Sequence, residues 1–205
     1  MLENAFQRAA LLLAPVLLLA GCGSLFSAEV QDSSVAVTRD FPGMPGLSRL
    51  GAAAGPVDVP TPVTFPVKGT FNADIPLTGQ NQGGTFKVTT IVTLNGAEVA
   101  MKSTSGGDLS GVSAAELQVY DPSADPSAAQ AKTIATYARP AAGPADPTRL
   151  HLAKSGAINL ADYLANQRMG LQLLLTVQGP VNFPQQDWTA ALTLDLYVDS
   201  KAEGP

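Results

Sequence analysis

The chain has 205 residues, with 12 basic and 17 acidic side chains, one histidine, one cysteine and a formal net charge of −5. This acidic balance argues against a basic surface for nucleic acid, and a single cysteine excludes an intramolecular disulfide. Glycine (19) and proline (16) are plentiful, and threonine and valine recur in short runs, which is typical of many strands and turns. The length suits one folded domain with a tether.

The first 21 residues have the three-part layout of a secretory signal. Arg8 and the amino terminus precede an apolar run, Ala9 to Leu19, and small residues follow it. A membrane-spanning helix needs about 20 apolar residues, so this run is too short, and Pro15 interrupts it. We therefore expect residues 1–21 to be a signal peptide that is absent from the mature protein.

The end of the apolar run, Leu19-Ala20-Gly21-Cys22, resembles the lipobox of bacterial lipoproteins. The resemblance implies cleavage before Cys22, a diacylglyceryl group on its sulfur and acylation of its new amino group. Each buried CH₂ contributes about 0.8 kcal/mol, so several acyl chains hold a protein stably on a bilayer. The next two residues are Gly and Ser, without the Asp that retains lipoproteins at the inner membrane of enteric-type bacteria. The resemblance therefore implies the outer membrane, and the alternative is an ordinary signal with an incidental cysteine.

Residues 22–64 are rich in proline and glycine and show no long periodic pattern. Such a composition is typical of an extended and partly stiff tether, which is expected to hold the folded part away from the membrane. One short piece, Ser34 to Thr38, has the composition of a strand. A domain that begins before residue 65 is therefore the alternative.

The patterned region starts near Phe65, where apolar residues alternate with polar ones as far as Ile75. This alternation predicts a half-buried strand. Two further strands are predicted over 85–94 and 97–103. Asn95-Gly96 lies between them and is a favoured two-residue hairpin turn, because both residues tolerate positive φ.

Shorter strands are expected at 115–120, 132–138 and 149–153, with proline-containing loops between them. One short helix is predicted from Leu160 to Asn166. Asn159 is its expected N-cap, with an acidic residue three positions later. We interpret this helix as a corner between strands.

Two long strands close the chain, with large apolar residues at every second position from Met169 to Val177 and from Trp188 to Val198. Full burial of each such side chain contributes roughly 1.5–3 kcal/mol, so this pair is predicted to form the centre of the core. Antiparallel pairing of the two strands is the simplest expectation. About eight strands and little helix predict an all-β domain over residues 65–205, namely an antiparallel β-sandwich, with a β-barrel as the alternative.

The sequence offers little for catalysis. His151 is the only histidine, and strand parity places it opposite Leu150 and Leu152, on a wet face. A general base needs a positioned nucleophile, and no Gly-x-Ser-x-Gly turn is present. We therefore predict that the protein is not an enzyme. Catalysis by His151 beside a serine and a carboxylate is the weaker hypothesis.

No metal or cofactor is predicted either. One histidine and one lipid-modified cysteine cannot build the usual zinc sites. Asp121 and Asp125 share a loop that could bind calcium together with Asp108 or Asp146, but the spacing is not that of a regular calcium loop. Aspartate before proline more often forms turns, which is the role we expect.

One candidate binding patch lies on the last strand. Tyr197 stands between Asp195 and Asp199 on the polar side of that strand, and such a group can form a small contact surface. A tyrosine on a solvated sheet face is also common without a ligand, because aromatic residues suit strands. Trp188 shares the parity of the buried leucines and is expected in the core.

Together these features predict a non-enzymatic lipoprotein of the cell envelope, anchored through Cys22, that acts in protein interaction or envelope structure. Its expected partners are the membrane, through the lipid, and other envelope proteins, but not nucleic acid. The alternative is a module that binds a small ligand or a carbohydrate, in an apolar groove between sheets or at the tyrosine patch.

Overall fold

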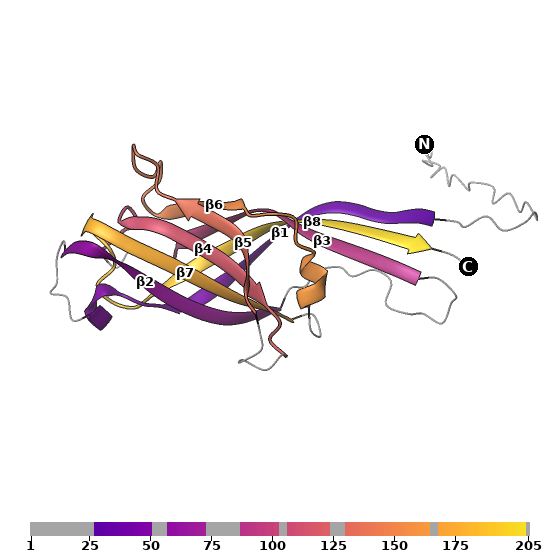
Figure 1. Cartoon of the computed structure of the whole chain (residues 1–205), viewed down its shortest axis with the longest axis horizontal. Coiled ribbons are helices and arrows are strands. Elements are labelled where there is room, and N and C mark those ends of the chain that lie inside the picture. Colours follow the sequence, from indigo (N-terminus) through magenta and orange to yellow (C-terminus); the bar gives the residue numbers. More distant parts are fainter. Residues whose placement is uncertain are drawn as a thin grey trace, which may run out of the picture.

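The computed structural model describes residues 27–50, 57–72, 87–102, 106–123, 130–164 and 168–203, and these residues form a nearly all-β structure (Figure 1). The strands are β1 (Ser27–Met44), β2 (Val57–Asn72), β3 (Lys87–Met101), β4 (Val112–Tyr120), β5 (Lys132–Ala138), β6 (Arg149–Lys154), β7 (Arg168–Val181) and β8 (Trp188–Glu203). Two short 3₁₀ helices, η1 (Leu47–Leu50) and η2 (Leu160–Tyr163), lie in connections. No helix in this part of the chain is long and apolar enough to span a membrane.

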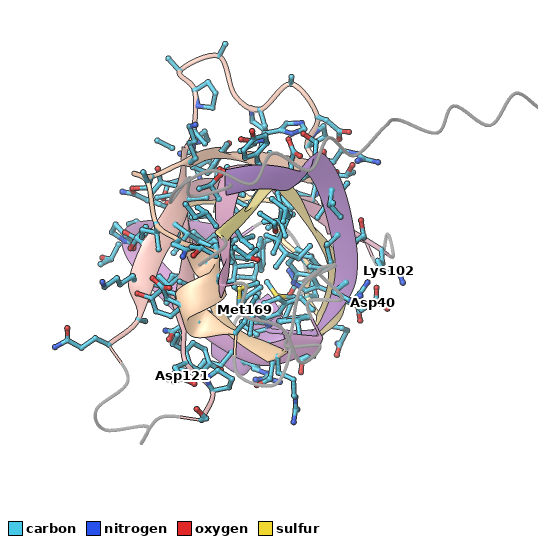
Figure 2. The ribbon with its side chains drawn as sticks, turned by 90° about the vertical axis from the view of Figure 1, so that its right-hand side faces the viewer. Asp40, Lys102, Asp121 and Met169 are labelled. Atoms are coloured by element: carbon cyan, nitrogen blue, oxygen red, sulfur yellow. The ribbon has the colours of Figure 1, made fainter. Side chains whose placement is uncertain are left out.

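All eight strands belong to one antiparallel sheet, in the order β1-β8-β3-β6-β5-β4-β7-β2. The sheet curls on itself into a half-barrel, which brings its edge strands β1 and β2 near each other (Figure 2). Long strands twist, and a twisted sheet with one apolar face buries that face by curling. The predicted all-β antiparallel fold is thereby confirmed. The single curled sheet corresponds to the barrel alternative rather than to two separate sheets.

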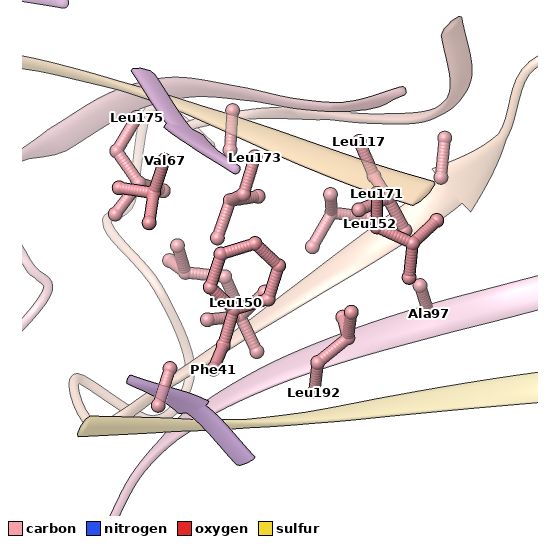
Figure 3. Packing of buried hydrophobic residues seen from close by; sticks show 14 of the residues in the cluster. Phe41, Val67, Ala97, Leu117, Leu150, Leu152, Leu171, Leu173, Leu175 and Leu192 are labelled. Atoms are coloured by element: carbon pink, nitrogen blue, oxygen red, sulfur yellow. The ribbon is translucent and has the colours of Figure 1, made fainter. Parts of the chain in front are cut away.

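β7 and β8 carry the centre of the core, as their alternation predicts. Every apolar residue on their inner faces, from Met169 to Val177 and from Trp188 to Val198, is buried. Figure 3 shows side chains of these strands meeting Phe41, Val67 and Leu150 in the interior. The apolar face of each strand therefore points into one shared core.

The predicted pairing of β7 with β8 is wrong. β7 pairs with β2 and β4, whereas β8 pairs with β1 and β3. The connection between them carries the buried Phe183, and the carbonyls of Pro184 and Gln185 accept hydrogen bonds from Leu47 and Ser48 at 2.9 and 3.0 Å. This connection crosses the end of the half-barrel. β8 therefore lies between β1 and β3, whereas β7 lies between β4 and β2.

The predicted hairpin at Asn95-Gly96 is also wrong, because residues 87–101 form the single strand β3. Its ladder with β8 continues on both sides of one β-bulge at Asn95. A bulge and a two-residue turn both shift the apolar alternation by one position, so Leu94 and Ala97 are buried as the pattern requires. The 16-residue β8 offers a partner along the whole of β3, which favours the continuous strand.

Part of the predicted tether, 22–64, belongs to the sheet. Residues 27–44 form β1, and 57–64 form the first half of β2, so the folded domain starts well before residue 65. β2 accommodates its prolines because it is an edge strand, which needs N–H donors on one side only. The short strand considered at Ser34–Thr38 lies within β1.

The three shorter strands follow the sequence prediction closely. β5 has the predicted bounds, and β4 and β6 contain the predicted segments 115–120 and 149–153. Leu117, Leu150 and Leu152 are buried on their inner faces. The alternation of apolar and polar residues therefore identifies these strands and the face of each strand that is buried.

The predicted helix is present but shorter. η2 is a four-residue 3₁₀ helix, because Leu164 is extended and donates its N–H to the Ala161 carbonyl at 3.2 Å. Asn159 caps it as predicted, and its Oδ1 accepts the N–H of Ala161 at 3.2 Å. The same oxygen accepts the N–H of Val92 at 2.9 Å, so η2 also covers part of the edge of β3.

At one end of the half-barrel, β1, β3 and β8 continue beyond the other strands as a three-stranded extension (Figure 1). We call this extension, made of 27–32, 87–91 and 199–203, the terminal ribbon. Its ladder joins Ser27 and Lys87 to Glu203, so the first and last described residues lie at its tip. Five residues of strand measure roughly 16 Å.

Loops close the opposite end. Leu109 and the β7–β8 connection are packed there, and a Cβ at Gly107 would lie 2.5 Å from the backbone nitrogen of Pro184. An ion pair between Arg49 of η1 and Asp187 fastens the β1–β2 connection to the same loop. The half-barrel is thus closed at one end and prolonged by the ribbon at the other.

Candidate functional site

The seam is the region where the edge strands β1 and β2 face each other across the opening of the half-barrel. Within the described residues, β1 pairs only with β8 and β2 only with β7, so no backbone ladder joins the two edges. Phe41 and Phe71 bridge the seam instead, with ring centroids 5.1 Å apart. Gly69 makes room for this contact, because a Cβ there would lie 2.8 Å from the Phe71 ring. Among the described residues, side chains rather than backbone hydrogen bonds join the two edges of the seam.

A groove of about 450 Å³ lies along this seam. Cationic side chains line it from three strands: Arg39 of β1, Lys68 of β2 and Arg168 of β7. The other lining residues are Asp40, Gly69, Thr70 and Phe71. We call this feature the seam groove. The curl of the sheet alone brings its cations together, since they are far apart in the sequence.

The carboxylate that lines the seam groove is already paired. Lys102, next to the end of β3, reaches across β8 and places its Nζ 2.8 and 2.9 Å from the two carboxylate oxygens of Asp40. Figure 2 shows the two side chains next to each other on the outer surface, whereas Met169 points into the interior. Lys68 and Arg168 add positive charge to the groove, on a chain whose net charge is −5.

Tyr120 holds Lys68 and the edge of β2 in place. The Lys68 Nζ lies 5.6 Å from the centroid of the Tyr120 ring, within the range of a cation–π contact. The Tyr120 hydroxyl donates to the Gly69 carbonyl at 3.4 Å. Its ring lies over Gly170 of β7, where a Cβ would come within 2.5 Å of it. The ring therefore crosses β7 from β4 and orders one cation at the groove.

Arg39 is a charged residue in an apolar row. Val37 and Phe41, two positions away on β1, are both buried, and the Arg39 Nη1 donates to the Thr38 carbonyl at 2.9 Å. An internal void next to Arg39, lined otherwise by apolar side chains, measures about 10 Å³. This is space for one water molecule and not for an organic ligand.

The predicted patch of Asp195, Tyr197 and Asp199 lies together on the outer face of β8. At this point β8 is flanked on both sides, with Tyr197 opposite Ser34 of β1 and Thr93 of β3. Asp195 is exposed, whereas the other two side chains are partly buried. None of the three lines the seam groove.

His151 lies on the outer face of β6 and is 73% exposed, as strand parity predicts. Its Nδ1 is 3.3 Å from a carboxylate oxygen of Glu98 on β3, and Glu98 also pairs with Arg149. These neighbours are a carboxylate and a guanidinium on an open sheet face. They provide no hydroxyl nucleophile for His151 to activate.

Asp121 and Asp146 form turns, the role expected of aspartate before proline. Their Oδ1 atoms accept the N–H groups of Ser123 and Thr148, each at 2.8 Å. Hydrogen bonds from Thr148 lower the pKa of Asp146 below its ordinary value. Asp125 lies outside the described residues, and among those described no group of three or more His, Cys, Asp or Glu side chains could hold a metal ion.

The predicted lipid anchor and the observed seam groove are not linked by this geometry. Cys22 and the signal peptide lie outside the described residues, so lipid anchoring stays a prediction. The seam groove, in turn, is not found by sequence reasoning. The one feature of the sequence that points to it is Arg39, a charged residue that alternates in register with the buried residues Val37 and Phe41.

No protein-family model, curated protein or solved structure matches this chain.

Proposed function

We propose that this chain is the precursor of a lipid-anchored envelope protein without enzymatic activity, which acts by binding other envelope proteins. The observation that carries the interaction role is the seam groove, where cationic side chains of β1, β2 and β7 lie together. Charged side chains gathered in an open groove suit a macromolecular partner, because charge steers association and fixes the orientation of the partner.

The proposed anchor rests on Leu19-Ala20-Gly21-Cys22 and on where the sheet begins. Ser27, at the tip of the terminal ribbon, is the fifth residue after Cys22. A stretch of this length spans at most about 17 Å, so an acylated Cys22 holds the ribbon tip close to the bilayer. The ribbon, roughly 16 Å long, then sets the distance between the membrane surface and the half-barrel. The outer membrane is the proposed location, since Gly and Ser follow Cys22.

The proposal of a binding protein rather than an enzyme is supported by the surroundings of His151. The only histidine of the chain faces solvent beside Glu98 and Arg149. The internal void next to Arg39, at about 10 Å³, does not support the ligand-carrier alternative. The outer surface, and the seam groove in particular, is therefore the proposed place of contact.

The anchor is tested by expressing the full chain in a bacterium that processes lipoproteins, followed by envelope fractionation and intact mass measurement. We expect a chain that begins at Cys22 and carries a diacylglyceryl group and an N-acyl group. Cys22→Ala should lose both the cleavage and the acyl mass. Recovery of envelope protein that still carries Met1 to Gly21, or an unmodified Cys22, would contradict the proposal.

A further inference from the structure

We propose that Asn95 is a modification site, at which the side-chain amide is lost without an enzyme and the bulge of β3 accommodates the isoaspartate that results. Asn95-Gly96 is the dipeptide whose sequence favours a hairpin turn and which the structure places in a bulge. This inference goes beyond the proposed function, because it concerns the outer face of the sheet and neither the membrane anchor nor the seam groove.

The reaction is an internal substitution at the side chain of Asn95. The backbone nitrogen of Gly96 attacks the Asn95 Cγ, so a bond from this nitrogen to Cγ forms and the bond from Cγ to Nδ2 breaks. The leaving amide group takes up the proton of the Gly96 nitrogen and departs as ammonia. Water then opens the cyclic imide. Attack of water at one carbonyl gives aspartate, and attack at the other gives isoaspartate, in which the backbone runs through the side-chain methylene.

Gly96 makes Asn95 the most reactive asparagine of the chain. Asn95 is the only asparagine that is followed by glycine, and glycine has no side chain that could crowd the attack of its own nitrogen. The surroundings of Gly96 are open as well, because the nearest atom to a Cβ added there is the Leu152 carbonyl oxygen at 3.8 Å. Ring closure therefore meets no steric obstacle from residue 96 or from β6.

The bulge supplies the backbone freedom that ring closure needs. The ladder with β8 passes from Leu94 to Gly96 and leaves Asn95 without a partner. On the other side of β3, the ladder with β6 ends at the pair of Gly96 and Ala153. Because pairing is disrupted at a bulge, local opening here breaks few hydrogen bonds and frees the Gly96 nitrogen. Asn95 is also exposed, so water reaches the imide.

Two other asparagines lack this combination and serve as internal references. The side chain of Asn159 is held, since its Oδ1 accepts two backbone N–H groups and its Nδ2 contacts Asp162 at 3.1 Å. Asn182 is exposed, but the buried Phe183 follows it. In both cases the attacking nitrogen belongs to a residue with a large side chain, which slows ring closure. Asn95 should therefore react before either of them.

The bulge also accommodates the product. Isoaspartate lengthens the backbone by one methylene, which in a regular ladder would push the later pairs out of register. At Asn95 the added methylene falls in a residue without a partner on β8, so the pairs on both sides of the bulge are kept. The new carboxylate stands near Asp195, which is exposed and lies opposite Gly96. The outer face of β8 thereby gains negative charge as the protein ages.

The experiment incubates the purified full-length protein in detergent micelles, in a mildly alkaline buffer made with heavy-oxygen water. Peptide mapping by mass spectrometry follows each asparagine, and fragmentation of the backbone distinguishes isoaspartate from aspartate. We expect Asn95 to convert first, with uptake of one heavy oxygen and isoaspartate as the main product. Asn159 and Asn182 should react at least about tenfold more slowly, which corresponds to a barrier higher by about 1.4 kcal/mol.

Gly96→Ala is the matched variant for the mechanism. The structure has room for the added methyl group, but this group crowds the attacking nitrogen, so conversion at Asn95 should slow by about tenfold. Asn95→Gln needs a larger ring and should show no conversion over the same time. Conversion at Asn95 that is as fast in Gly96→Ala, or no faster than at Asn182, would overturn the site. Conversion of Asn95 only in urea-unfolded protein would overturn it too, because the folded bulge would then protect the residue.

A second measurement tests whether the bulge accommodates isoaspartate. Urea unfolding, followed by the fluorescence of the buried Trp188, compares the aged protein with fresh Asn95→Asp. Both carry the new carboxylate beside Asp195, and only the aged protein has the longer backbone. We expect the two to unfold at the same urea concentration. A lower midpoint for the aged protein than for Asn95→Asp would contradict accommodation of the added methylene by the bulge.

Discussion

Gly107 lies where the β7–β8 connection passes over the loop that precedes β4, and a Cβ there would meet the backbone nitrogen of Pro184 at 2.5 Å. Gly107→Ala should therefore lower the free energy of unfolding by roughly 1–3 kcal/mol. At Gly96 the nearest atom to an added Cβ is the Leu152 carbonyl oxygen at 3.8 Å, so Gly96→Ala should change little. Urea unfolding followed by the fluorescence of Trp188, the only tryptophan and a buried one, measures both. Equal losses in the two variants would contradict the close contact at Gly107.

Asp187 makes stability depend on pH in the acid range. Its hydrogen bonds from Arg49, followed by one from the Gly46 N–H, hold its pKa below the ordinary value of 3.8. Because the pKa is lower in the folded state than in the unfolded state, this contribution is present above about pH 4 and is lost as the pH falls through the folded-state value. The stability difference between wild type and Asp187→Asn should be constant from about pH 5 to about pH 8 and shrink below about pH 4.

The control for this prediction is Arg49→Gln, which removes the main cause of the lowered pKa of Asp187. In that background the effect of Asp187→Asn should lose most of its pH dependence. Chemical unfolding at several pH values measures the differences. If the difference in the free energy of unfolding between wild type and Asp187→Asn grew below about pH 4, the lowered pKa of Asp187 would be contradicted.

At the scale of single elements, the bulge in β3 makes a distinctive prediction about deletions. Asn95 is the extra residue of that bulge, so its deletion leaves Leu94 and Ala97 inward with Gly96 between them and keeps the ladder with β8 in register. We expect the free energy of unfolding to change by about 1 kcal/mol or less. Deletion of Thr93 instead turns Leu94 outward and a polar residue inward, and should cost roughly 2–4 kcal/mol. An Asn95 deletion that unfolds the protein would rule out a simple bulge.

η2 is fastened to the sheet through one side-chain oxygen. The Oδ1 of Asn159 accepts the N–H groups of Val92 and Ala161 at 2.9 and 3.2 Å, and Asn159→Ala leaves both donors without this acceptor. The free energy of unfolding should fall by roughly 1–3 kcal/mol, and the Val92 amide should exchange faster in hydrogen-exchange measurements. Asp162→Ala, which removes only the contact to the Asn159 Nδ2 at 3.1 Å, should have a smaller effect. A Val92 amide that exchanges equally slowly in Asn159→Ala would argue against this link.

Alternation in the sequence predicts strands and their buried faces better than it predicts their partners. The inner faces of β7 and β8, the bounds of β5 and the cap at Asn159 all follow from local pattern. The pairing of β7 with β8 fails because a buried Phe183 carries their connection across the end of the half-barrel. The hairpin at Asn95 fails because a bulge and a turn leave the same alternation, and only the long β8 favours the bulge.

At the scale of the whole molecule, the seam groove could not be predicted from local pattern. Arg39, Lys68 and Arg168 belong to β1, β2 and β7, which meet only after eight strands have been ordered and the sheet has curled. Sequence spacing contains no information on such a meeting. The predicted patch around Tyr197 was accessible to sequence reasoning for the opposite reason, since its three residues lie on one strand and share one face.

The two ends of the half-barrel differ in a way that suits one orientation. Loops fastened by Arg49 and Asp187 close one end, whereas the terminal ribbon at the other end carries Ser27, five residues after Cys22. A lipid on Cys22 would hold the ribbon end toward the bilayer and leave the closed end farthest from it. The seam groove, on the side of the half-barrel, would then stay open to proteins next to the membrane.

The most direct test is photo-crosslinking in intact cells, with a photoreactive phenylalanine placed at Thr70 in the seam groove or at Lys154 in the middle of the sheet. We predict a protein adduct from Thr70 only, and its loss in Lys68→Gln. Equal adducts from both positions, or an adduct from Thr70 that persists without the Lys68 charge, would contradict binding at the seam.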